Sequence, residues 1–260
     1  MQIEIIENYI VVPATMNAAL EGRFLLDTGA DATVVVPQLA KRLGLKTTHY
    51  HIGGVAGGKK IKVPLSNIDA LSIDGHSTAL DPVAIVDINK DPGPYGKTDG
   101  VIGSDFLRKF PVTIDYPRSE LIFEETASLE KRKQNGTVLK LTLLEETTPF
   151  LRVWLNGTPK GDYKLDTGAG TTQLPLEDLT SLGIKEGNPS VNVQQSSSLG
   201  GSYRVLETRL ESFSLAPEME IKDLRVKAYE CKYGFIGGDY LRNFVVTLNY
   251  KDRYIVLTRS

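Results

Sequence analysis

The stretch Leu-Leu-Asp-Thr-Gly-Ala at residues 25–30 occurs a second time, with Lys in place of the first Leu, at residues 164–169. In each copy an aspartate, Asp27 or Asp166, follows a run that is typical of a β-strand and precedes a threonine and a glycine. A glycine at such a place lets the backbone turn sharply and lets another segment approach closely. Because a carboxylate at the end of a buried strand is costly without a partner or a task, the repetition predicts that Asp27 and Asp166 are partners.

The repeat extends well beyond these six residues. A single Asp-Thr-Gly is typical of an ordinary loop, since all three are common turn residues. Here the flanking residues repeat as well, and the matches are 43–46 with 182–185, 100–110 with 234–244, and 112–116 with 246–250. The spacing is 139 residues for the first match and 134 for the other two, so the second half lacks about five residues in between. We infer the duplication of a whole domain.

These motifs resemble those of aspartic peptidases of the retropepsin and pepsin kind. The family signature is two apolar residues and Asp-Thr-Gly, followed later in the same lobe by two apolar residues and glycine. Val-Ile-Gly at 101–103 and Phe-Ile-Gly at 235–237 supply the second element here. Both first motifs end in alanine, Ala30 and Ala169, as in retroviral proteases, so the chain resembles two retropepsin protomers fused into one.

The resemblance implies an all-β acid protease fold, with two homologous β-barrel lobes related by a pseudo-twofold axis and with short helices. We expect an N-terminal lobe at residues 1–128, a linker at 129–137 within a charged segment, and a C-terminal lobe at 138–260. The resemblance also implies that the terminal strands of the two halves form a sheet beneath the site.

Local patterns indicate the elements of each half. Residues 3–12 are apolar and β-branched and predict one strand. Residues 11–16 and 23–26 predict a hairpin that leads into the first Asp-Thr-Gly. The matching segments 37–43 and 175–182 predict short helices that each end at a glycine.

Composition and charge narrow the classes of function. The chain has 260 residues and a net charge of −2, so no strong field favours nucleic acid or an anionic membrane. No apolar run is long enough to span a membrane, and residues 1–4 show no signal peptide. A removed leader would leave the same picture, so localisation stays open and includes export or a periplasmic location.

The sequence offers no clustered ligand set for a metal or cofactor. Cys231 is the single cysteine, which excludes an intramolecular disulfide. His49 and His51 lie two residues apart without other clustered ligands, so we expect them in a solvated strand rather than at a metal. We expect neither a metal nor an organic cofactor.

A glycine-rich segment between two extended arms, residues 51–63, is typical of a β-hairpin. It resembles the flap of retroviral proteases, and this resemblance assigns substrate contacts to Gly53, Gly54, Val55, Ala56, Gly57 and Gly58. The segment is one residue longer than that flap, and a plain glycine-rich hairpin is the alternative. The second half has a more polar counterpart at residues 194–202.

A pseudo-twofold axis between the lobes would bring Asp27 and Asp166 together as catalytic residues. Two adjacent carboxylates cannot both ionise cheaply, so they share one proton, and one acts as a base while the other acts as an acid. The ionised partner would take a proton from a water molecule that attacks the peptide carbonyl. The protonated partner would donate to the carbonyl oxygen.

The resemblance assigns supporting roles to the neighbours of the two aspartates. Thr28 and Thr167 are expected to hydrogen-bond across the axis to the opposite lobe, and Gly29 and Gly168 to leave room for the carboxylates and the substrate. Asp31 occupies the position of an acid that binds the substrate main chain, and a turn-capping carboxylate is the equally weighted alternative. The second half has a glycine at that place, so we expect an asymmetric cleft.

Three interpretations of function and assembly fit these features. The first is an aspartic endopeptidase that acts on a peptide or protein substrate. The second is a catalytically silent peptide-binding module with the same fold, because fold alone does not establish activity. The third is a pair of chains that each lend one lobe to the other. Since both halves are nearly equally complete, we expect a monomer with an intramolecular pseudo-dimer.

Overall fold

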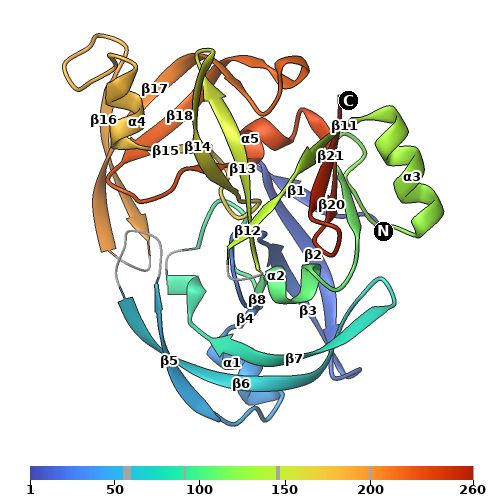
Figure 1. Cartoon of the computed structure of the whole chain (residues 1–260). Helices are drawn as coiled ribbons and strands as arrows, with labels where there is room; N and C mark the ends of the chain where they lie inside the picture. The colour runs from blue at the N-terminus through green and yellow to red at the C-terminus, as the bar shows by residue number, and fades with distance from the viewer. Residues whose placement is uncertain (55–59, 91, 145–146, 199–200, 260) are drawn as a thin grey trace.

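The computed structural model describes residues 1–54, 60–90, 92–144, 147–198 and 201–259, and its strands form three sheets (Figure 1). The sheet of the first half runs, in spatial order, β1(Glu4–Ile6), β2(Tyr9–Met16), β3(Leu20–Leu26), β8(Gly100–Ile102), β4(Val34–Val35), β7(His76–Ile85), β6(Lys60–Ile73) and β5(His49–Gly54). The sheet of the second half runs β12(Thr142–Leu144), β13(Thr148–Leu155), β14(Thr158–Leu165), β19(Phe235–Ile236), β15(Gln173–Pro175), β18(Ile221–Tyr229), β17(Gly201–Ser214) and β16(Asn192–Ser198).

These two sheets correspond strand by strand. Each closes on itself through one further pairing, β2 with β6 in the first half and β13 with β17 in the second. In each, the strand that leads into Asp-Thr-Gly pairs in parallel with the strand that carries the second motif, β3 with β8 and β14 with β19. The sequence repeat is therefore a structural repeat, and the predicted all-β, two-lobe acid protease fold is confirmed.

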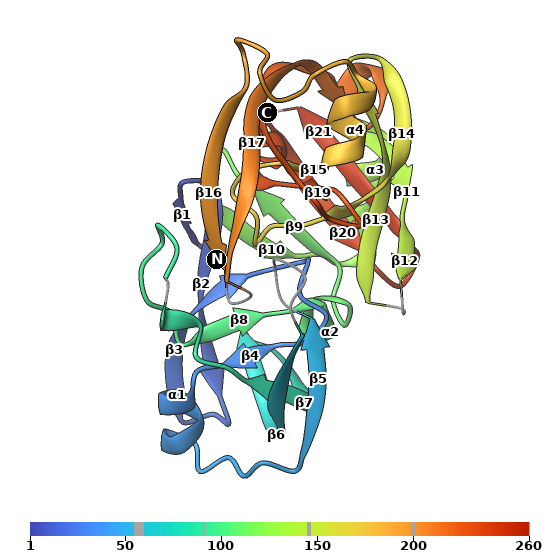
Figure 2. The same ribbon diagram turned by 90° about the vertical axis from the view of Figure 1, so that its left-hand side faces the viewer.

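A third sheet joins the lobes, and Figure 2 shows its strands β9, β10 and β20 between the first half below and the second half above. Its order is β10(Glu120–Phe123), β9(Val112–Asp115), β20(Phe244–Asn249), β21(Tyr254–Arg259) and β11(Thr137–Lys140). In its middle, Thr113 lies opposite Thr247, its own counterpart in the repeat, and their hydroxyl oxygens are 2.7 Å apart. The pseudo-twofold axis therefore passes between these two threonines, and the terminal strands of both halves share one sheet.

The helices are short, as predicted. They are α1(Pro37–Arg42), α2(Ser104–Leu107), α3(Thr126–Asn135), α4(Leu176–Ser181) and α5(Gly238–Leu241), with 3₁₀ turns η1(Ile88–Lys90) and η2(Pro217–Met219). α1 and α4 occupy equivalent places, and Gly44 and Gly183 follow them with φ of 66° and 78°, left-handed values that suit glycine. Across the residues that the structure describes, no helix combines the length and the apolar character needed to cross a membrane.

The prediction of a single strand at residues 3–12 is wrong. β1 and β2 form a two-residue hairpin in which Ile6 pairs with Tyr9. Glu7 and Asn8 between them have φ of 46° and 75°, and positive φ at both central residues is typical of a tight hairpin turn. The apolar residues on both sides of this short turn read as one continuous run. The turn also places Asn8 against the second lobe, where its Nδ2 donates to the backbone oxygen of Gly170 at 2.9 Å.

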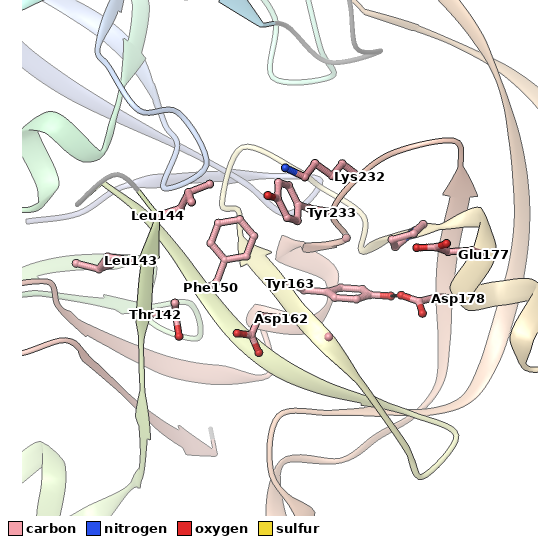
Figure 3. A pocket seen from close by; sticks show the side chains of 13 residues that line it. Thr142, Leu143, Leu144, Phe150, Asp162, Tyr163, Glu177, Asp178, Lys232 and Tyr233 are labelled. Carbon is pink, nitrogen blue, oxygen red and sulfur yellow. Dashed lines mark hydrogen bonds between the residues drawn. The ribbon is translucent and has the colours of Figure 1, made fainter.

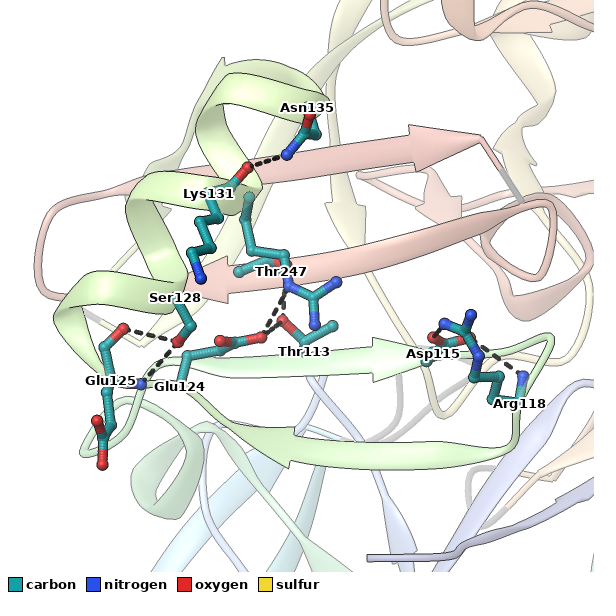
Figure 4. A network of polar contacts seen from close by, with 10 residues as sticks. Thr113, Asp115, Arg118, Glu124, Glu125, Ser128, Lys131, Asn135 and Thr247 are labelled. Atoms are coloured by element: carbon teal, nitrogen blue, oxygen red, sulfur yellow. Dashed lines mark hydrogen bonds and ion pairs between the residues drawn. The ribbon is translucent and has the colours of Figure 1, made fainter.

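The charged segment predicted as a linker contains α3, which is anchored to the shared sheet by a buried acid (Figure 4). Glu124 precedes the helix, and its Oε1 accepts hydrogen bonds from Thr113 Oγ1 at 2.5 Å and from Arg132 Nε at 2.9 Å. In the first turn of α3, the Oγ of Ser128 accepts a hydrogen bond from the backbone N–H of Glu125 at 3.1 Å. The link between the lobes is therefore held at the pseudo-twofold axis by polar contacts that its composition did not reveal.

A continuous apolar core extends through both lobes and the shared sheet. Leu26 and Leu165, which precede the two aspartates, belong to it and are fully buried. Asp27 and Asp166 therefore leave the core at the ends of β3 and β14, on backbone that packing holds in place.

Candidate active site

The two Asp-Thr-Gly turns meet between the lobes through their threonines. Thr28 donates its hydroxyl proton to the backbone oxygen of Leu165 at 2.8 Å and accepts from the N–H of Thr167 at 3.1 Å. Thr167 repeats both bonds in the opposite direction, donating to the oxygen of Leu26 at 2.7 Å and accepting from the N–H of Thr28 at 3.0 Å. Both threonines are fully buried. The cross-axis bonds expected from the resemblance are present, and they lock the two turns together.

The glycines of the two turns let the aspartates come into contact. A methyl group on Gly29 would lie 2.5 Å from Cγ of Asp166, and one on Gly168 would collide with Cγ of Asp27. Any side chain at either position would therefore displace a carboxyl group. The carboxyl groups of Asp27 and Asp166 are therefore neighbours across the axis, and each affects the pKa of the other.

The two carboxyl groups have unequal surroundings. Oδ1 of Asp27 accepts from the N–H of Gly29 at 2.7 Å and from the N–H of Ala30 at 3.1 Å. Oδ1 of Asp166 is buried and has no hydrogen-bond partner among the described residues. Burial raises the pKa of Asp27, while the hydrogen bonds and the nearby Lys164 oppose the rise. Burial and then the charge of Asp27 hold the pKa of Asp166 well above its usual range. The pair therefore retains a proton, and Asp166 is the better place for it.

The second motif supports each turn from below. Ser104, after Val-Ile-Gly, donates its N–H to the oxygen of Ala30 at 2.8 Å, and Gly238, after Phe-Ile-Gly, donates to Ala169 at the same distance. A methyl group on Gly103 would lie 2.7 Å from the backbone of Ala32. These glycines are therefore required for the close packing of the second motif beneath the turn.

Two further acids, both partly buried and both missed by the sequence analysis, brace the segments after the turns. Asp105 accepts from the N–H and the hydroxyl of Thr33 at 2.8 and 2.7 Å. Asp239 accepts from the same two groups of Thr172 at the same distances. Burial raises the pKa of Asp239 to about 6. The sequence signal for these acids was that an Asp follows the second motif in both halves. It did not identify the threonine partner, which lies about seventy residues earlier in each lobe.

Asp31 contacts the second lobe. Its Oδ1 accepts from the hydroxyl of Thr147 at 3.1 Å and from that of Thr148. At the equivalent place across the axis, Gly170 packs against the ring of Tyr9. The hydroxyl contacts of Asp31 therefore correspond to an aromatic contact at Gly170. The surroundings of the Asp27 and Asp166 carboxyl groups are asymmetric at this position.

Tyr9, Tyr95, Tyr229 and Tyr250 lie close enough to the carboxyl pair for its charge to affect their pKa values, and none was predicted from the sequence as part of the site. Tyr9 and Tyr95 meet edge to face with ring centres 4.9 Å apart, and Tyr203 and Tyr229 lie at the same separation. Burial raises the pKa of Tyr9, Tyr95 and Tyr229, and the charge of the aspartates adds to this rise. Neutral phenol rings therefore line this region at ordinary pH.

The glycine-rich segment forms the predicted hairpin, in which β5 pairs with β6 and Gly53 lies opposite Ile61. Gly53 and Gly54 end the β5 arm, whereas Val55, Ala56, Gly57 and Gly58 lie outside the described residues. In the second half β16 pairs with β17 in the same way. Figure 1 shows both hairpins at the left of the molecule, one from each lobe.

A separate pocket of about 410 Å³ lies in the second lobe and does not include the two aspartates (Figure 3). Phe150, Asp162 and Tyr233 are among its lining residues. In the first lobe the residue equivalent to Asp162 is Arg23, which donates to the backbone oxygens of Tyr95 and Lys97. Tyr95 and Lys97 lie in the loop that joins β7 to β8 in the first lobe. The equivalent connection in the second lobe, between β18 and β19, is shorter, and the pocket lies there.

No group of three or more His, Cys, Asp or Glu side chains that could hold a metal ion occurs within the part of the chain that the structure describes.

Comparison with known proteins agrees with this geometry. The family model for aspartyl proteases matches residues 12–106 and 151–240, more than half of the chain. Each matched segment contains one Asp-Thr-Gly turn and its second motif. No curated protein matches the chain. With one match in each lobe, the chain belongs to the aspartyl protease family.

Proposed function

We propose that this chain is an aspartic endopeptidase that hydrolyses peptide bonds with water activated by Asp27 and Asp166. Membership of the family supports a protease that acts on peptide substrates. The observation that carries the finer proposal is the pair of neighbouring carboxyl groups, each packed against the glycine of the opposite turn, in which burial raises both pKa values. Because both carboxyl groups come from one chain, the proposal includes a monomer that needs no second copy.

The unequal surroundings of the two carboxyl groups support a division of labour. A carboxylate that accepts backbone N–H bonds is stabilised in its charged form, so Asp27 carries the charge and Asp166 the proton. Asp27 takes a proton from the attacking water, and Asp166 donates its proton to the peptide carbonyl oxygen. The product of this step is a neutral gem-diol.

The roles of the two aspartates then reverse. Asp27, now protonated, donates to the leaving nitrogen while Asp166 takes a proton from one hydroxyl of the gem-diol. The C–N bond breaks, a carboxylic acid and an amine form, and the dyad returns to its starting state. Each proton that enters the dyad leaves it, so no other acid or base is required.

Substrate binding is proposed to involve both glycine-rich hairpins and the groups beside the dyad. An extended peptide would lie across the two carboxyl groups, beside the arm that ends at Gly53 and Gly54. The neutral rings of Tyr9, which is partly buried, and of Tyr229, which is buried, support an apolar surface near the scissile bond.

The test is the replacement of each aspartate by its neutral isostere. Asp27→Asn and Asp166→Asn should each lower kcat/KM by about 10²–10⁴-fold, since neither acid works without the other. Asp69→Asn, on the exposed face of β6, is the control and should leave the rate unchanged. Digestion of a peptide library supplies the substrate for these measurements. Full activity of Asp166→Asn would remove the dyad from the mechanism.

The same variants separate a peptidase from a silent binding module. A peptide that contains a statine hydroxyl, which can lie between two carboxyl groups, should bind the wild type more tightly than either Asn variant. Binding of peptides without any cleavage by the wild type would favour the silent module.

A further inference from the structure

Lys164 is the one residue at which the two six-residue motifs differ, because Leu25 stands at the same place in the first copy. Leu25 is buried and apolar, with 4% of its surface exposed. Lys164 instead extends across the lobe boundary, and its Nζ donates to the backbone oxygen of Gly29 at 3.1 Å. Of the two Asp-Thr-Gly turns, only the first can receive this bond, since a leucine has no donor.

The strand positions Lys164 for this contact. Tyr163 and Leu165, its neighbours on β14, belong to the core of the second lobe, so the alternation of the strand directs Lys164 to the other face. There it pairs with Phe150 on β13 and Phe235 on β19. Its ammonium lies 5.8 Å from the centre of the Phe235 ring. A partly buried side chain between two aromatic residues has little freedom to leave the Gly29 oxygen.

The Gly29 oxygen belongs to the same peptide group as the N–H of Ala30. That N–H donates to Oδ1 of Asp27 at 3.1 Å. Lys164 therefore begins a chain of two hydrogen bonds that passes through one peptide group and ends on Asp27. Bonds in such a chain polarise one another, so a cation at one end strengthens the donor at the other end.

Among the described residues, four phenol groups also face the dyad, and they are neutral. They come from β2, the loop before β8, the end of β18 and the turn after β20, and they are Tyr9, Tyr95, Tyr229 and Tyr250. Burial raises the pKa of all four phenols, so they stay protonated while the dyad titrates. The charge of Lys164, in contrast, lowers the pKa of both Asp27 and Asp166.

We propose that Lys164 is a positioning residue of the dyad: through the Gly29 oxygen it fixes the turn of the opposite lobe and makes Asp27 the carboxyl group that carries the negative charge. This proposal rests on the proposed function, because it assigns the base of that mechanism. It also explains how two turns of nearly identical sequence form a dyad with distinct roles. A cation favours the ionised dyad, so its loss should shift titration and activity toward higher pH.

The test compares three variants of Lys164. Lys164→Leu copies the first lobe, Lys164→Gln removes the charge but keeps a donor for the Gly29 oxygen, and Lys164→Arg keeps the charge. The carboxyl ¹³C resonances of Asp27 and Asp166 are followed against pH by NMR. In parallel, kcat/KM is measured against pH on a cleaved peptide. Thermal unfolding of each variant verifies that it is folded.

The Leu and Gln variants should titrate about one pH unit higher than the wild type, and the acidic limb of kcat/KM should move by the same amount. Lys164→Arg should stay close to the wild type in both measurements. Unchanged titration in both neutral variants, or an equal shift in the Arg variant, would overturn the role of the cation. Because the NMR titration needs no turnover, it tests Lys164 even if the wild type cleaves no peptide, an outcome that would refute only the proposed function.

Discussion

Thr28 and Thr167 bind each other's lobe with the same pair of bonds. The hydroxyl of each accepts the N–H of the other and donates to the carbonyl that precedes the opposite aspartate. Both side chains are fully buried, so water cannot replace any of these partners. The position of the two carboxyl groups relative to each other therefore depends directly on this exchange.

Removal of one of these hydroxyls should weaken the whole lobe contact. Thr28→Ala leaves the Leu165 carbonyl and the Thr167 N–H buried without a partner, and each such group costs about 1–3 kcal/mol. We expect the free energy of unfolding to fall by about 2–4 kcal/mol in urea titrations. Thr28→Ser keeps the hydroxyl and should stay within about 1 kcal/mol of the wild type. Equal stability of the Ala and Ser variants would contradict this account.

Asp31 should contribute through its contact with Thr148. Hydrogen bonds to a charged group are worth about 1.5–3 kcal/mol, and both Thr147 and Thr148 donate to this carboxylate. In a double-mutant cycle, Asp31→Ala and Thr148→Val should therefore be non-additive in unfolding free energy by about 1 kcal/mol or more. Additive effects would return Asp31 to the substrate-binding or turn-capping role that its sequence position suggests.

The alanines after the two Asp-Thr-Gly motifs should influence the working pH. A serine hydroxyl at these places could donate to the ionised carboxylate, which favours ionisation and lowers the pKa of the dyad. Without such donors the dyad should hold its proton in weak acid, with activity on the order of pH 4.5 to 6.5. Ala30→Ser combined with Ala169→Ser should shift the profile of kcat/KM toward acid by a measurable fraction of a unit. An unchanged or higher optimum would exclude the missing hydroxyls as its cause.

The glycine-rich hairpin of the first lobe is expected to move during turnover. Gly57 lies outside the described residues, and in the sequence it stands between the paired strands β5 and β6. Gly57→Pro should lower kcat/KM while the melting temperature stays near that of the wild type, because a stiffened flap slows closure. Gly200→Pro, in the more polar segment at residues 194–202, should have a smaller effect; Gly200 also lies outside the described residues. Wild-type kinetics for Gly57→Pro would make this hairpin part of the scaffold.

The sequence was sufficient for the architecture because the chain repeats it. Two copies of the same motifs at constant spacing predict two equivalent lobes, and equivalent lobes place Asp27 and Asp166 at equivalent strand ends. The short helices before Gly44 and Gly183 follow from local pattern, which a sequence records directly. The sheet shared by both halves was expected only from the resemblance to aspartic peptidases.

Other local features were hidden by their composition. The turn at Glu7 and Asn8 interrupts an apolar run for only two residues, so the hairpin read as one strand. In the charged segment, α3 buries Leu129 alone among its residues, so no apolar stripe indicated a helix. Its anchor, Glu124, depends on Thr113 of the shared sheet, which local sequence does not identify.

What distinguishes one lobe from the other was decided by tertiary structure. The change from Leu25 to Lys164 is visible in the sequence, but its meaning depends on a backbone oxygen at Gly29, in the other lobe. The same holds for Asp31 with Thr148 and for Gly170 with Tyr9. The sequence by itself determined that two carboxyl groups would meet. Only the packing of the lobes placed the Lys164 cation at the turn of Asp27 and buried Asp166 Oδ1 without a partner among the described residues, because hydrogen bonds and charge act over a few ångströms in space.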